Sequence, residues 1–496
     1  MNPSTGVHSP LNPQNHIEIT HTKFLELGIS ERHPDYEEQL SQWEYLADLY
    51  DGVFAWLKLT DVGFVPTEKT QKYLPRHIEE DYDSWVSRIN SSHYDDLFAK
   101  AVNRFTDLIF RNGVTFSPDS EEFKRYFENL SDRGDAGQIF LHYLSLKAMV
   151  FGHVWVMVDY PVTNFFSYAD FLASPISPYW VYYDPRNVIN WKFLQNECVS
   201  ATIRETVLVD DGLKRVEVEQ YRVFFMGFWY FYRQTSDKRG WTVESGDMPS
   251  EFVPLVPVFG GVRLDEARSL PPLKSLADKN RALYQQQSDH SRKVSLCCQP
   301  VPVLKDQMRG DEPLRIGPNS FLQIRDPNGS FEWVEPLALS LTESREDLDG
   351  LKASIASDAA NFLVSPTDRQ SATATNLLTN PLEASLSGFV TRFLDGINSV
   401  AEVYCTYLGI DTVKIGLDPD VFPDATKDSQ TSFALQNLYT TGIISKETAL
   451  EALVALGFLP KTIDINEEID RTNGTGTTEA ATGTTTGSDR EAGTTN

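Results

Sequence analysis

Few side chains in this sequence are placed where they could do covalent chemistry. Among nine His residues, His142 and His153 lie in one apolar stretch, which favours packed, hydrogen-bonded core histidines over a pair of metal ligands. The sequence has no phosphate-binding loop, no GxGxxG, no GxSxG and no HExxH. We therefore expect no enzyme activity, no cofactor and no metal.

Two acidic pairs, Asp81 with Asp83 and Asp95 with Asp96, could be imagined as metal carboxylates. Anions near the N-terminus of a helix complement its dipole, so helix-start charges are the better interpretation of both pairs.

The four cysteines, Cys198, Cys297, Cys298 and Cys405, form no CxxC motif. The adjacent pair has no neighbouring His or basic cluster, and we interpret it as a packed thiol pair. This pattern excludes a zinc ribbon or a disulfide framework and indicates a reducing compartment.

The aromatic run from Phe224 to Tyr232 could form a base-stacking platform. It lacks a surrounding field of Lys and Arg, which favours a buried sheet instead.

The chain has 496 residues, of which 41% are hydrophobic, and a formal net charge of −26. Because so acidic a surface does not neutralise phosphates, a conventional DNA-binding surface is unexpected. The N-terminal residues show no basic segment followed by an apolar one, and His142, Lys147 and His153 interrupt the most apolar window, Phe140–Tyr160. We expect no signal peptide, no membrane span and a soluble protein made in the cytosol.

Hydrophobic periodicity predicts an α+β chain. After a poorly ordered arm over residues 1–35, a helix is expected from about Asp35, and another over Ser92–Phe110 with Ser92 and Asp95 as a capping box. Two more are expected near 120–130 and 136–151. An antiparallel meander follows, with strands at His153–Tyr160, Tyr179–Tyr183, Val188–Phe193, Ala201–Val209 and Val216–Arg233.

Three longer helices are predicted over Pro271–Cys298, Ser340–Leu363 and Thr373–Leu408. The first two enclose a small β module with strands at Val301–Leu304, Phe321–Ile324 and Phe331–Val334. A helix pair at Gln430–Tyr439 and Lys446–Leu456, with Ser445 as N-cap and Gly457 as C′ residue, precedes a disordered Thr/Gly-rich tail over 471–496.

The helix predicted over Pro271–Cys298 is unusually polar for its length. Beside an apolar stripe it carries a stripe with charges of both signs: Lys274, Asp278, Arg281, Gln285, Asp289 and Arg292. Such a helix cannot be buried on all sides in one compact core, and it favours a wall shared with neighbouring subunits. A solvated face of an ordinary helical hairpin is the alternative.

Several short segments occur in a characteristic order: Tyr73-Leu74-Pro75, Glu79, Tyr82, Arg88, Ile109-Phe110, Val188-Ile189-Asn190-Trp191, Arg204-Glu205, Gln220-Tyr221-Arg222-Val223, Pro271-Pro272-Leu273, Leu276-Ala277, Asn280, Tyr284, Ile316-Gly317-Pro318, Ser371-Ala372-Thr373-Ala374 and Gly442-Ile443-Ile444-Ser445-Lys446-Glu447-Thr448. In this order and spacing the sequence resembles the portal proteins of tailed bacteriophages, more narrowly a portal-like family common in phages and prophages. The resemblance covers roughly residues 70–465. It departs before Tyr284, where a His is more usual.

The resemblance implies a phage portal fold with these parts: a flexible arm over 1–35, a wing over 36–265, stem helices over 266–298 and 340–364, a clip over 299–339, a tunnel loop over 365–372, a long helix and wing return over 373–420, crown helices over 421–470 and a tail over 471–496.

The resemblance also implies a mechanical function. Portal subunits form a ring, usually a dodecamer, at a unique capsid vertex of the virion, and its channel passes double-stranded DNA during packaging and ejection. The implied partners are the major capsid protein, a scaffolding protein, the terminase large subunit and a head-to-tail adaptor, with no membrane.

Three groups of residues take roles in this picture. We expect Thr367, Asp368, Arg369 and Gln370 to face DNA from the tunnel loop, and Lys274, Arg281 and Arg292 to make transient phosphate contacts from the stem. The clip residues expected to dock the motor and the adaptor are Lys305, Asp306, Arg309, Asp311, Glu312 and Arg315.

Two rival interpretations remain. A soluble enzyme with an unrecognised site in the β-rich domain would require a concave cluster of titratable groups, which the sequence does not display. Another ring-forming virion part, such as an adaptor, would be much shorter than this chain.

Overall fold

The computed structural model describes residues 17–160, 177–195, 197–212, 214–248, 252–297, 301–305, 324, 326–334, 339–363, 372–417, 429–441 and 444–455. Helices and sheets both contribute, in agreement with the predicted α+β class. The chain divides into two compact units, one of residues Met1–Ser365 and Pro381–Pro419 and one of residues Pro366–Asn380 and Asp420–Asn496.

Residues 17–35, predicted to belong to a poorly ordered arm, are folded. β1 (Ile17–Thr20) pairs antiparallel with β11 (Gly240–Asp247), and α1 (His21–Glu26) buries Phe24. The Phe24 ring stacks on Trp241 with centroids 3.9 Å apart. Elements this short carry no hydrophobic period, so the pattern of the sequence could not indicate them.

The helix expected from about Asp35 is α2 (Pro34–Asp51), which has Pro in its first turn and buries Trp43, Leu46 and Leu49. After it come short elements: η1 (Val53–Ala55), the hairpin of β2 (Leu57–Thr60) and β3 (Gly63–Pro66), and α3 (Thr70–Tyr73). α6 (Glu121–Phe127) and α7 (Gly137–Phe151) lie where two further helices were predicted.

The helix predicted over Ser92–Phe110 is α5 (Leu97–Ile109), which begins five residues later than predicted, and α4 (Tyr82–Ser91) before it was not predicted. Ser92 ends α4 and donates its hydroxyl to the Arg88 carbonyl at 2.6 Å, so the predicted capping box of Ser92 and Asp95 is wrong. Asp81 does cap α4, because its Oδ1 accepts the Ser84 N–H at 2.9 Å, as expected of a helix-start charge.

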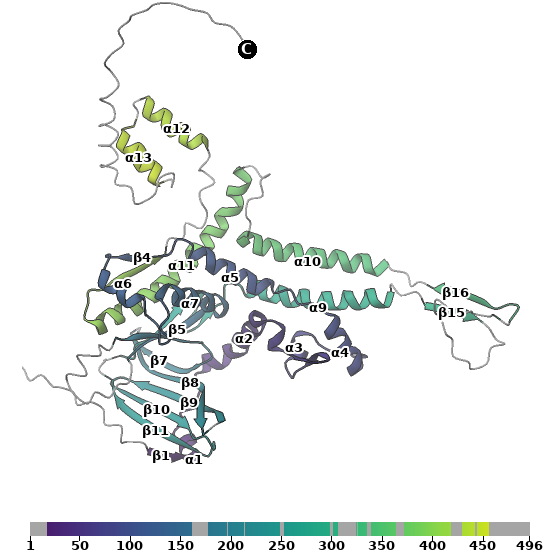
Figure 1. The fold of residues 1–496 in the computed structure, drawn as a ribbon, viewed down its shortest axis with the longest axis horizontal. Helices are drawn as coiled ribbons and strands as arrows, with labels where there is room; N and C mark the ends of the chain where they lie inside the picture. Colours follow the sequence, from purple (N-terminus) through teal and green to yellow (C-terminus); the bar gives the residue numbers. More distant parts are fainter. Residues whose placement is uncertain are drawn as a thin grey trace, which may run out of the picture. The chain divides into compact units, whose positions relative to one another are not determined.

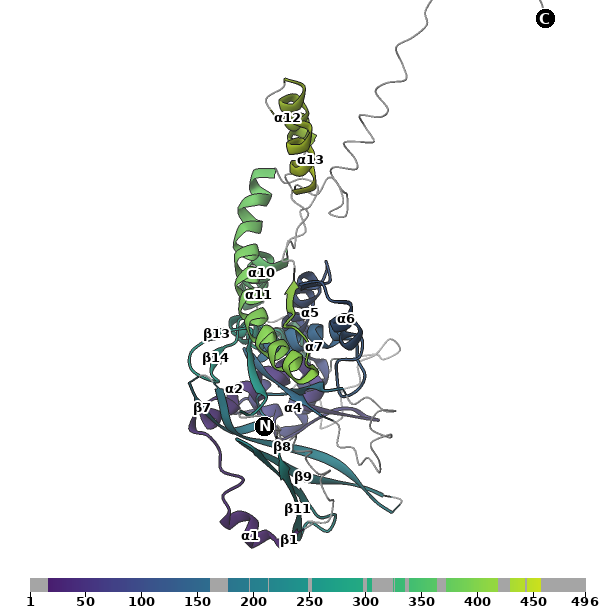
Figure 2. The same ribbon diagram turned by 90° about the vertical axis from the view of Figure 1, so that its left-hand side faces the viewer.

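The predicted meander forms most of a six-stranded antiparallel sheet in the order β1-β11-β10-β9-β8-β7, labelled in Figure 1 and seen turned by 90° in Figure 2. Its other strands are β7 (Val188–Leu194), β8 (Glu197–Asp211), β9 (Lys214–Phe225) and β10 (Phe228–Gln234).

The first two predicted strands do not belong to this sheet. β5 (His153–Asp159) and β6 (Tyr179–Tyr183) instead form a three-stranded sheet with β12 (Leu255–Phe259). Two further strand pairs are β4 (Val114–Ser117) with β17 (Lys414–Leu417), and β13 (Val262–Arg263) with β14 (Ser269–Leu270).

The aromatic run is only partly buried, which corrects the prediction of a buried sheet. Phe224 and Tyr232 are buried, whereas Phe225, Phe228 and Tyr230 around the β9–β10 turn are exposed. Successive residues of a strand point to opposite faces, and only one face here packs against the core.

The long helices lie within a few residues of their predicted ranges: α9 (Lys274–Cys297), α10 (Leu339–Leu363) and α11 (Ala372–Leu408). α9 and α10 lie side by side (Figure 1). Between them in the chain, β15 (Val301–Lys305) pairs antiparallel with β16 (Ser330–Val334). Of the strand predicted at Phe321–Ile324, Ile324 belongs to no strand and the rest lies outside the described residues.

In the second unit, α12 (Ser429–Thr440) and α13 (Lys446–Ala455) form the predicted helix pair. The Ser445 hydroxyl accepts the Thr448 N–H at 3.1 Å, which confirms Ser445 as the N-cap. Gly457 and the predicted disordered tail lie outside the described residues.

Candidate functional site

The pair formed by α9 and α10 meets along a narrow seam. On α10 the seam residues recur every three or four positions: Leu341, Ser344, Leu348, Leu351 and Ile355. Leu348 and Ile355 are buried and the other three are half-buried. This spacing is that of a single packed helix face, which contacts α9 and, to a lesser extent, α5.

Polar side chains bridge the seam at two places. Lys279 of α9 donates to Ser354 Oγ at 2.8 Å and to Asp358 Oδ2 at 2.5 Å. Eleven residues farther along α9, His290 Nδ1 lies 3.2 Å from the Ser344 hydroxyl. These directional contacts fix the register of the two helices, which a purely apolar seam would leave less well defined.

The rest of the α10 surface between Leu341 and Asp358 is open. Its exposed charged residues are Glu343, Arg345, Glu346, Asp347, Asp349 and Lys352, with acidic residues in the majority. Arg345 lies 3.9 Å from Asp349, a pair too exposed to contribute much to stability. Between Leu341 and Asp358, α10 is thus packed along one edge and mostly exposed over the rest of its surface.

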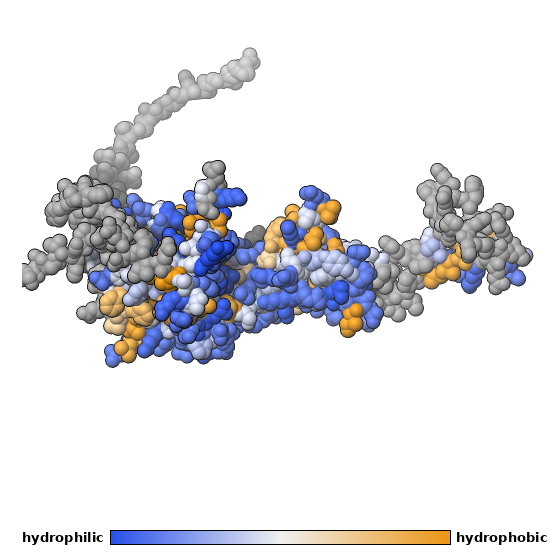
Figure 3. Space-filling model, turned by 90° about the horizontal axis from the view of Figure 1, so that it is seen from below, coloured by the Kyte–Doolittle hydropathy of each residue, from blue (hydrophilic) through white to orange (hydrophobic). Residues whose placement is uncertain are grey.

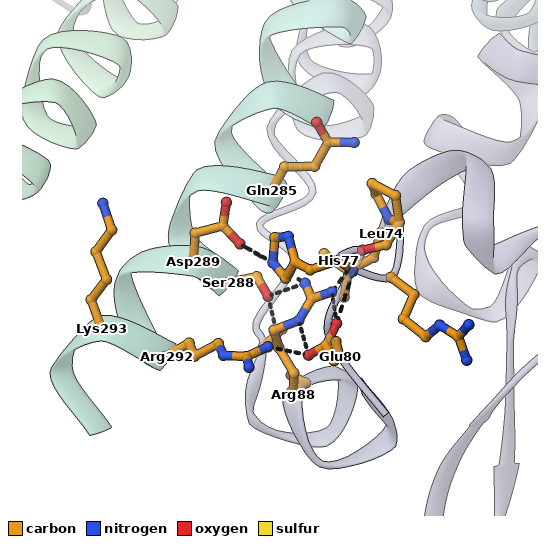
Figure 4. Close-up of polar contacts among 12 residues, drawn as sticks. Leu74, His77, Glu80, Arg88, Gln285, Ser288, Asp289, Arg292 and Lys293 are labelled. Atoms are coloured by element: carbon orange, nitrogen blue, oxygen red, sulfur yellow. Dashed lines mark hydrogen bonds and ion pairs between the residues drawn. The ribbon is translucent and has the colours of Figure 1, made fainter. Parts of the chain in front are cut away.

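The opposite side of α9 is anchored by a buried ion cluster (Figure 4). Arg88 of α4 binds Glu80 with two hydrogen bonds, from Nε to Oε1 at 2.9 Å and from an Nη to Oε2 at 2.8 Å. Its other Nη donates to the Ser288 hydroxyl of α9 at 3.1 Å. Arg292 of α9 also binds Glu80. A guanidinium that binds a carboxylate with two parallel hydrogen bonds is among the strongest ion pairs in proteins.

The Glu80 carboxylate is fully enclosed, with 0% of its side chain exposed, and Arg88 has 3% exposed. Hydrogen bonding from Arg88 lowers the pKa of Glu80 to about 2, so the group is charged at neutral pH. A buried carboxylate that is paired in this way is costly to leave without its partner.

Two further contacts extend the anchor along α9. Asp289 Oδ1 lies 3.1 Å from His77 Nε2, and Gln285 donates to the Tyr73 carbonyl at 3.0 Å. The segment from Tyr73 to Ser92 is thereby attached to about two turns of α9.

Near the start of α9 the same side contacts α2. Asp278 accepts the Tyr45 hydroxyl at 2.9 Å and pairs with Lys274 at 2.7 Å. The Arg281 guanidinium lies over the Tyr45 ring, 5.4 Å from its centroid.

Asn280, which the sequence singled out only through the resemblance, has a defined structural role. Its side chain is buried, and its Oδ1 accepts the N–H groups of Leu97 and Phe98 at 3.0 and 3.2 Å. Asn280 therefore caps α5 from α9, while Asp96, the residue before α5, makes no side-chain cap. Nothing local in the sequence indicates a cap supplied from so far along the chain.

The polar groups of this site pair mainly with one another, and the contact of His290 with the Ser344 hydroxyl lies in the seam between α9 and α10. The arrangement holds one long helix against a helical base. These contacts fix the position of α9 on one side, and α10 packs on its other side.

The structure places all three predicted stem cations on the anchored side of α9. Lys274 pairs with Asp278, Arg281 lies over Tyr45 and Arg292 binds Glu80. Their expected contact with DNA phosphates stays a prediction.

The other predicted site residues are mostly outside the described part of the chain. This holds for Thr367, Asp368, Arg369 and Gln370 of the loop and for Asp306, Arg309, Asp311, Glu312 and Arg315 of the β module. Lys305 is described; it is exposed at the end of β15, 4.0 Å from Glu332.

The two histidines differ in their surroundings. His153 is buried, contacts the Ser269 hydroxyl at 3.1 Å and has its pKa lowered to about 3 by burial, as expected of a core residue. His142 is not a core residue: it is partly exposed and lies 3.0 Å from Asp107.

Of the cysteines, Cys198 and Cys405 are buried free thiols, and burial raises the pKa of Cys198 to about 12. Cys298 and the side chain of Cys297 lie outside the described part.

A second group of titratable residues lies in the β-rich region. Arg222 is within 3.5 Å of Asp159 and 3.2 Å of Glu205, and burial raises the pKa of Asp159. β5 carries Asp159, while β8 and β9 carry the other two, so these ion pairs join the three-stranded sheet to the six-stranded one. A guanidinium shared by two carboxylates is a sufficient structural reason for this group.

In the described ranges, no group of three or more His, Cys, Asp or Glu side chains is placed to hold a metal ion. The helices in those ranges include none with the length and apolar character needed to cross a bilayer.

Residues 272–408, which contain α9, α10 and α11, match a family described as "Domain of unknown function (DUF4055)". None of the curated proteins matches the sequence.

Solved structures from gene transfer agent (GTA) particles are similar in fold at low scores. A chain of the "Virion of native gene transfer agent (GTA) particle" has a TM-score of 0.41 and 10% identity, covering 78% of this chain and 97% of that one. A chain of the "Neck of native GTA particle computed with C12 symmetry" has 0.41 and 11%, covering 73% and 89%. A chain of the "Neck of empty GTA particle computed with C6 symmetry" has 0.40 and 11%, covering 77% and 94%.

Proposed function

We propose that this chain is a portal protein of a tailed bacteriophage or a related particle. Many copies would form a ring at one vertex of the capsid, and double-stranded DNA would pass through the central channel during packaging and ejection. The proposal rests on the resemblance of residues 70–465 to portal proteins together with the architecture of the α9–α10 unit.

The single observation that carries the proposal is the one-sided packing of α10. A helix of 25 residues, about 38 Å long, contacts α9 and, to a lesser extent, α5, and leaves most of residues 341–358 exposed. Helices in one compact domain bury a broader apolar stripe. A long helix with a narrow seam is expected where neighbouring subunits complete its surroundings.

The buried anchor supports the same function. A helix in a channel wall must keep its orientation while DNA moves past it. The enclosed pair of Glu80 and Arg88 holds α9 to the segment that contains α4. Asn280 adds a second point of attachment at α5. Together these contacts make the α9–α10 unit a rigid part of the subunit.

In this function, the β15–β16 module would dock the terminase large subunit and later a head-to-tail adaptor, with Lys305 among the docking residues. The loop containing Thr367, Asp368, Arg369 and Gln370 would face DNA. The net charge of −26 per chain favours a channel that lets phosphates slide without holding them.

The function is tested by replacing Thr367–Gln370 with a Gly/Ser segment in a particle-producing strain. We expect rings to assemble while the amount of packaged DNA falls severalfold. Protein that assembles rings and packages a full complement of DNA would remove the loop from the mechanism. Unfolded subunits would show that the segment is core.

A further inference from the structure

The two sides of α9 carry different surfaces. At about 100° per residue, Ser288 lies about 180° around α9 from Lys279. Lys279 contacts α10, whereas Ser288 contacts Arg88 of α4. Figure 1 shows α9 between α10 on one side and α2, α3 and α4 on the other. The helices α10, α9 and α3 therefore have two outer flanks: the exposed side of α10 forms one, and the α3 region forms the other.

The flank formed by α10 is acidic. We define its outer face by Glu343, Glu346, Asp347 and Asp349, all exposed. Arg345 and Lys352 are the exposed cations on the same stretch, so the acidic groups outnumber them. No described segment of the chain covers this face.

The opposite flank carries three cations that form no ion pair with the carboxylates in the described part of the chain. We define the cationic face by Lys72, Arg76 and Arg281. Lys72 and Arg281 both lie over the Tyr45 ring, at 5.4 Å from its centroid, and none of the three forms an ion pair with a described carboxylate.

Neighbouring residues define the limits of the cationic face. Lys69 does not add to it, because its charge is balanced by Asp48 at 2.8 Å. Glu68 and Glu79, both exposed, flank Lys72 and Arg76 in the sequence, and the exposed Glu44 is close enough to Tyr73, over whose ring Lys72 also lies, to add to the effect of burial in raising the pKa of that tyrosine.

The cationic flank also exposes apolar surface. Ile78, two residues after Arg76, is 99% exposed, and Leu59 of β2 is 58% exposed. Seen from the side that carries α3 and α4, hydrophobic areas interrupt a mainly hydrophilic surface (Figure 3). Exposed apolar groups beside unpaired charges are typical of a surface that a partner covers.

We propose that the outer face of α10 in one subunit docks on the cationic face of the next subunit, head to tail. This inference rests on the proposed function, since it names the contact that would build the ring. A two-fold pairing would place acidic α10 against acidic α10, which like charges oppose. A head-to-tail contact joins unlike faces, and repeated around an axis it closes a ring. For a chain of net charge −26, local pairing of opposite charges offsets the general repulsion between copies.

The test is a charge exchange in the full chain. One variant carries Glu346→Lys with Asp347→Lys, a second carries Lys72→Glu with Arg76→Glu, and a third combines all four. All four side chains are exposed, so thermal unfolding is expected to match the wild type. The control for the first variant is Glu122→Lys with Glu128→Lys, two exposed positions on and just after α6, which makes the same charge change as that variant away from both faces.

Mass photometry at low salt gives the readout. We expect wild type and control to form rings, each two-residue variant to lose at least tenfold in ring population, and the combined variant to regain it. Rings that persist in both two-residue variants would overturn the proposed contact and leave the proposed function intact. A combined variant that stays dissociated would show that the two faces do not meet. A wild type that forms no ring would overturn the proposed function itself.

Discussion

At the level of single residues, the enclosed Glu80 makes the α9 anchor sensitive to acid. Its pKa is lowered from 4.5 to about 2, so the folded state binds fewer protons there than the unfolded state. The resulting stabilisation is complete above about pH 5 and is lost as pH falls from about 4.5 toward 2. Its full size is about 3 kcal/mol.

We therefore expect Glu80→Gln, which cannot ionise, to remove part of the acid sensitivity. The difference in unfolding free energy between wild type and variant, measured in urea from pH 7 to pH 3, is expected to shrink as pH falls. A difference that stays constant over this range would mean that Glu80 is not the group responsible.

The partner Arg88 is expected to matter more than Arg292, although both bind Glu80. Arg88 has 3% of its side chain exposed and Arg292 has 38%. Removing a partner from a buried ion pair costs about 3–5 kcal/mol, and we expect a smaller cost for Arg292, whose guanidinium is more than a third exposed and therefore screened by solvent. Urea unfolding of Arg88→Ala and Arg292→Ala compares the two, and equal losses would contradict the enclosed geometry.

The cap that Asn280 supplies to α5 gives a local prediction. Asn280→Ala leaves the N–H groups of Leu97 and Phe98 without their acceptor, at a cost of about 1–2 kcal/mol. Hydrogen exchange at these two amides is expected to accelerate about tenfold or more. Gln286→Ala, at an exposed position of the same helix, serves as the control and should leave both amides unchanged.

These residue contacts are the part that the sequence could not predict. Asp81 and Ser445 each accept a hydrogen bond from the N–H group three residues later, so their caps could be predicted from local spacing. Asn280 acts on Leu97, and Ser288 acts on Arg88, from about 180 and 200 positions away. Such contacts exist only after the chain has brought α9 against α4 and α5.

At the level of elements, the narrow seam between α9 and α10 depends on few side chains. Ile355 is 2% exposed, and Ile355→Ala is expected to cost about 2–5 kcal/mol of local stability through the cavity it leaves. Hydrogen exchange along α10 measures this loss, with the exposed Lys352→Ala as the matched control. Equal protection of α10 in the two variants would show that other contacts hold it.

Elements were predicted well where a periodic apolar pattern extends over many residues, and poorly where it covers only a few. α10 (Leu339–Leu363) was expected over Ser340–Leu363, because an apolar stripe persists over many turns. α5 was predicted to begin at Ser92 rather than at Leu97, because Ser92 and Asp95 have the spacing of a capping box, and α4 was not predicted. β1 and α1 escaped detection because their burial is decided by Tyr221 and Trp241 far along the chain.

At the scale of the whole molecule, the sequence predicted the α+β class and the order of its long helices, while the division of the strands into two sheets came from tertiary packing. The exposed surface of α10 and the buried ion pairs that anchor α9 have a common explanation if the chain is one subunit of a closed ring. Its acidic surface then belongs to a conduit for DNA rather than to a DNA-binding surface.

Electron microscopy of the purified full chain tests the central claim most directly. We expect rings of many copies with a central hole and with the α9–α10 pairs arranged around it. Compact single particles of 56.0 kDa with no ring, at concentrations and salt that keep the chain folded, would contradict the claim.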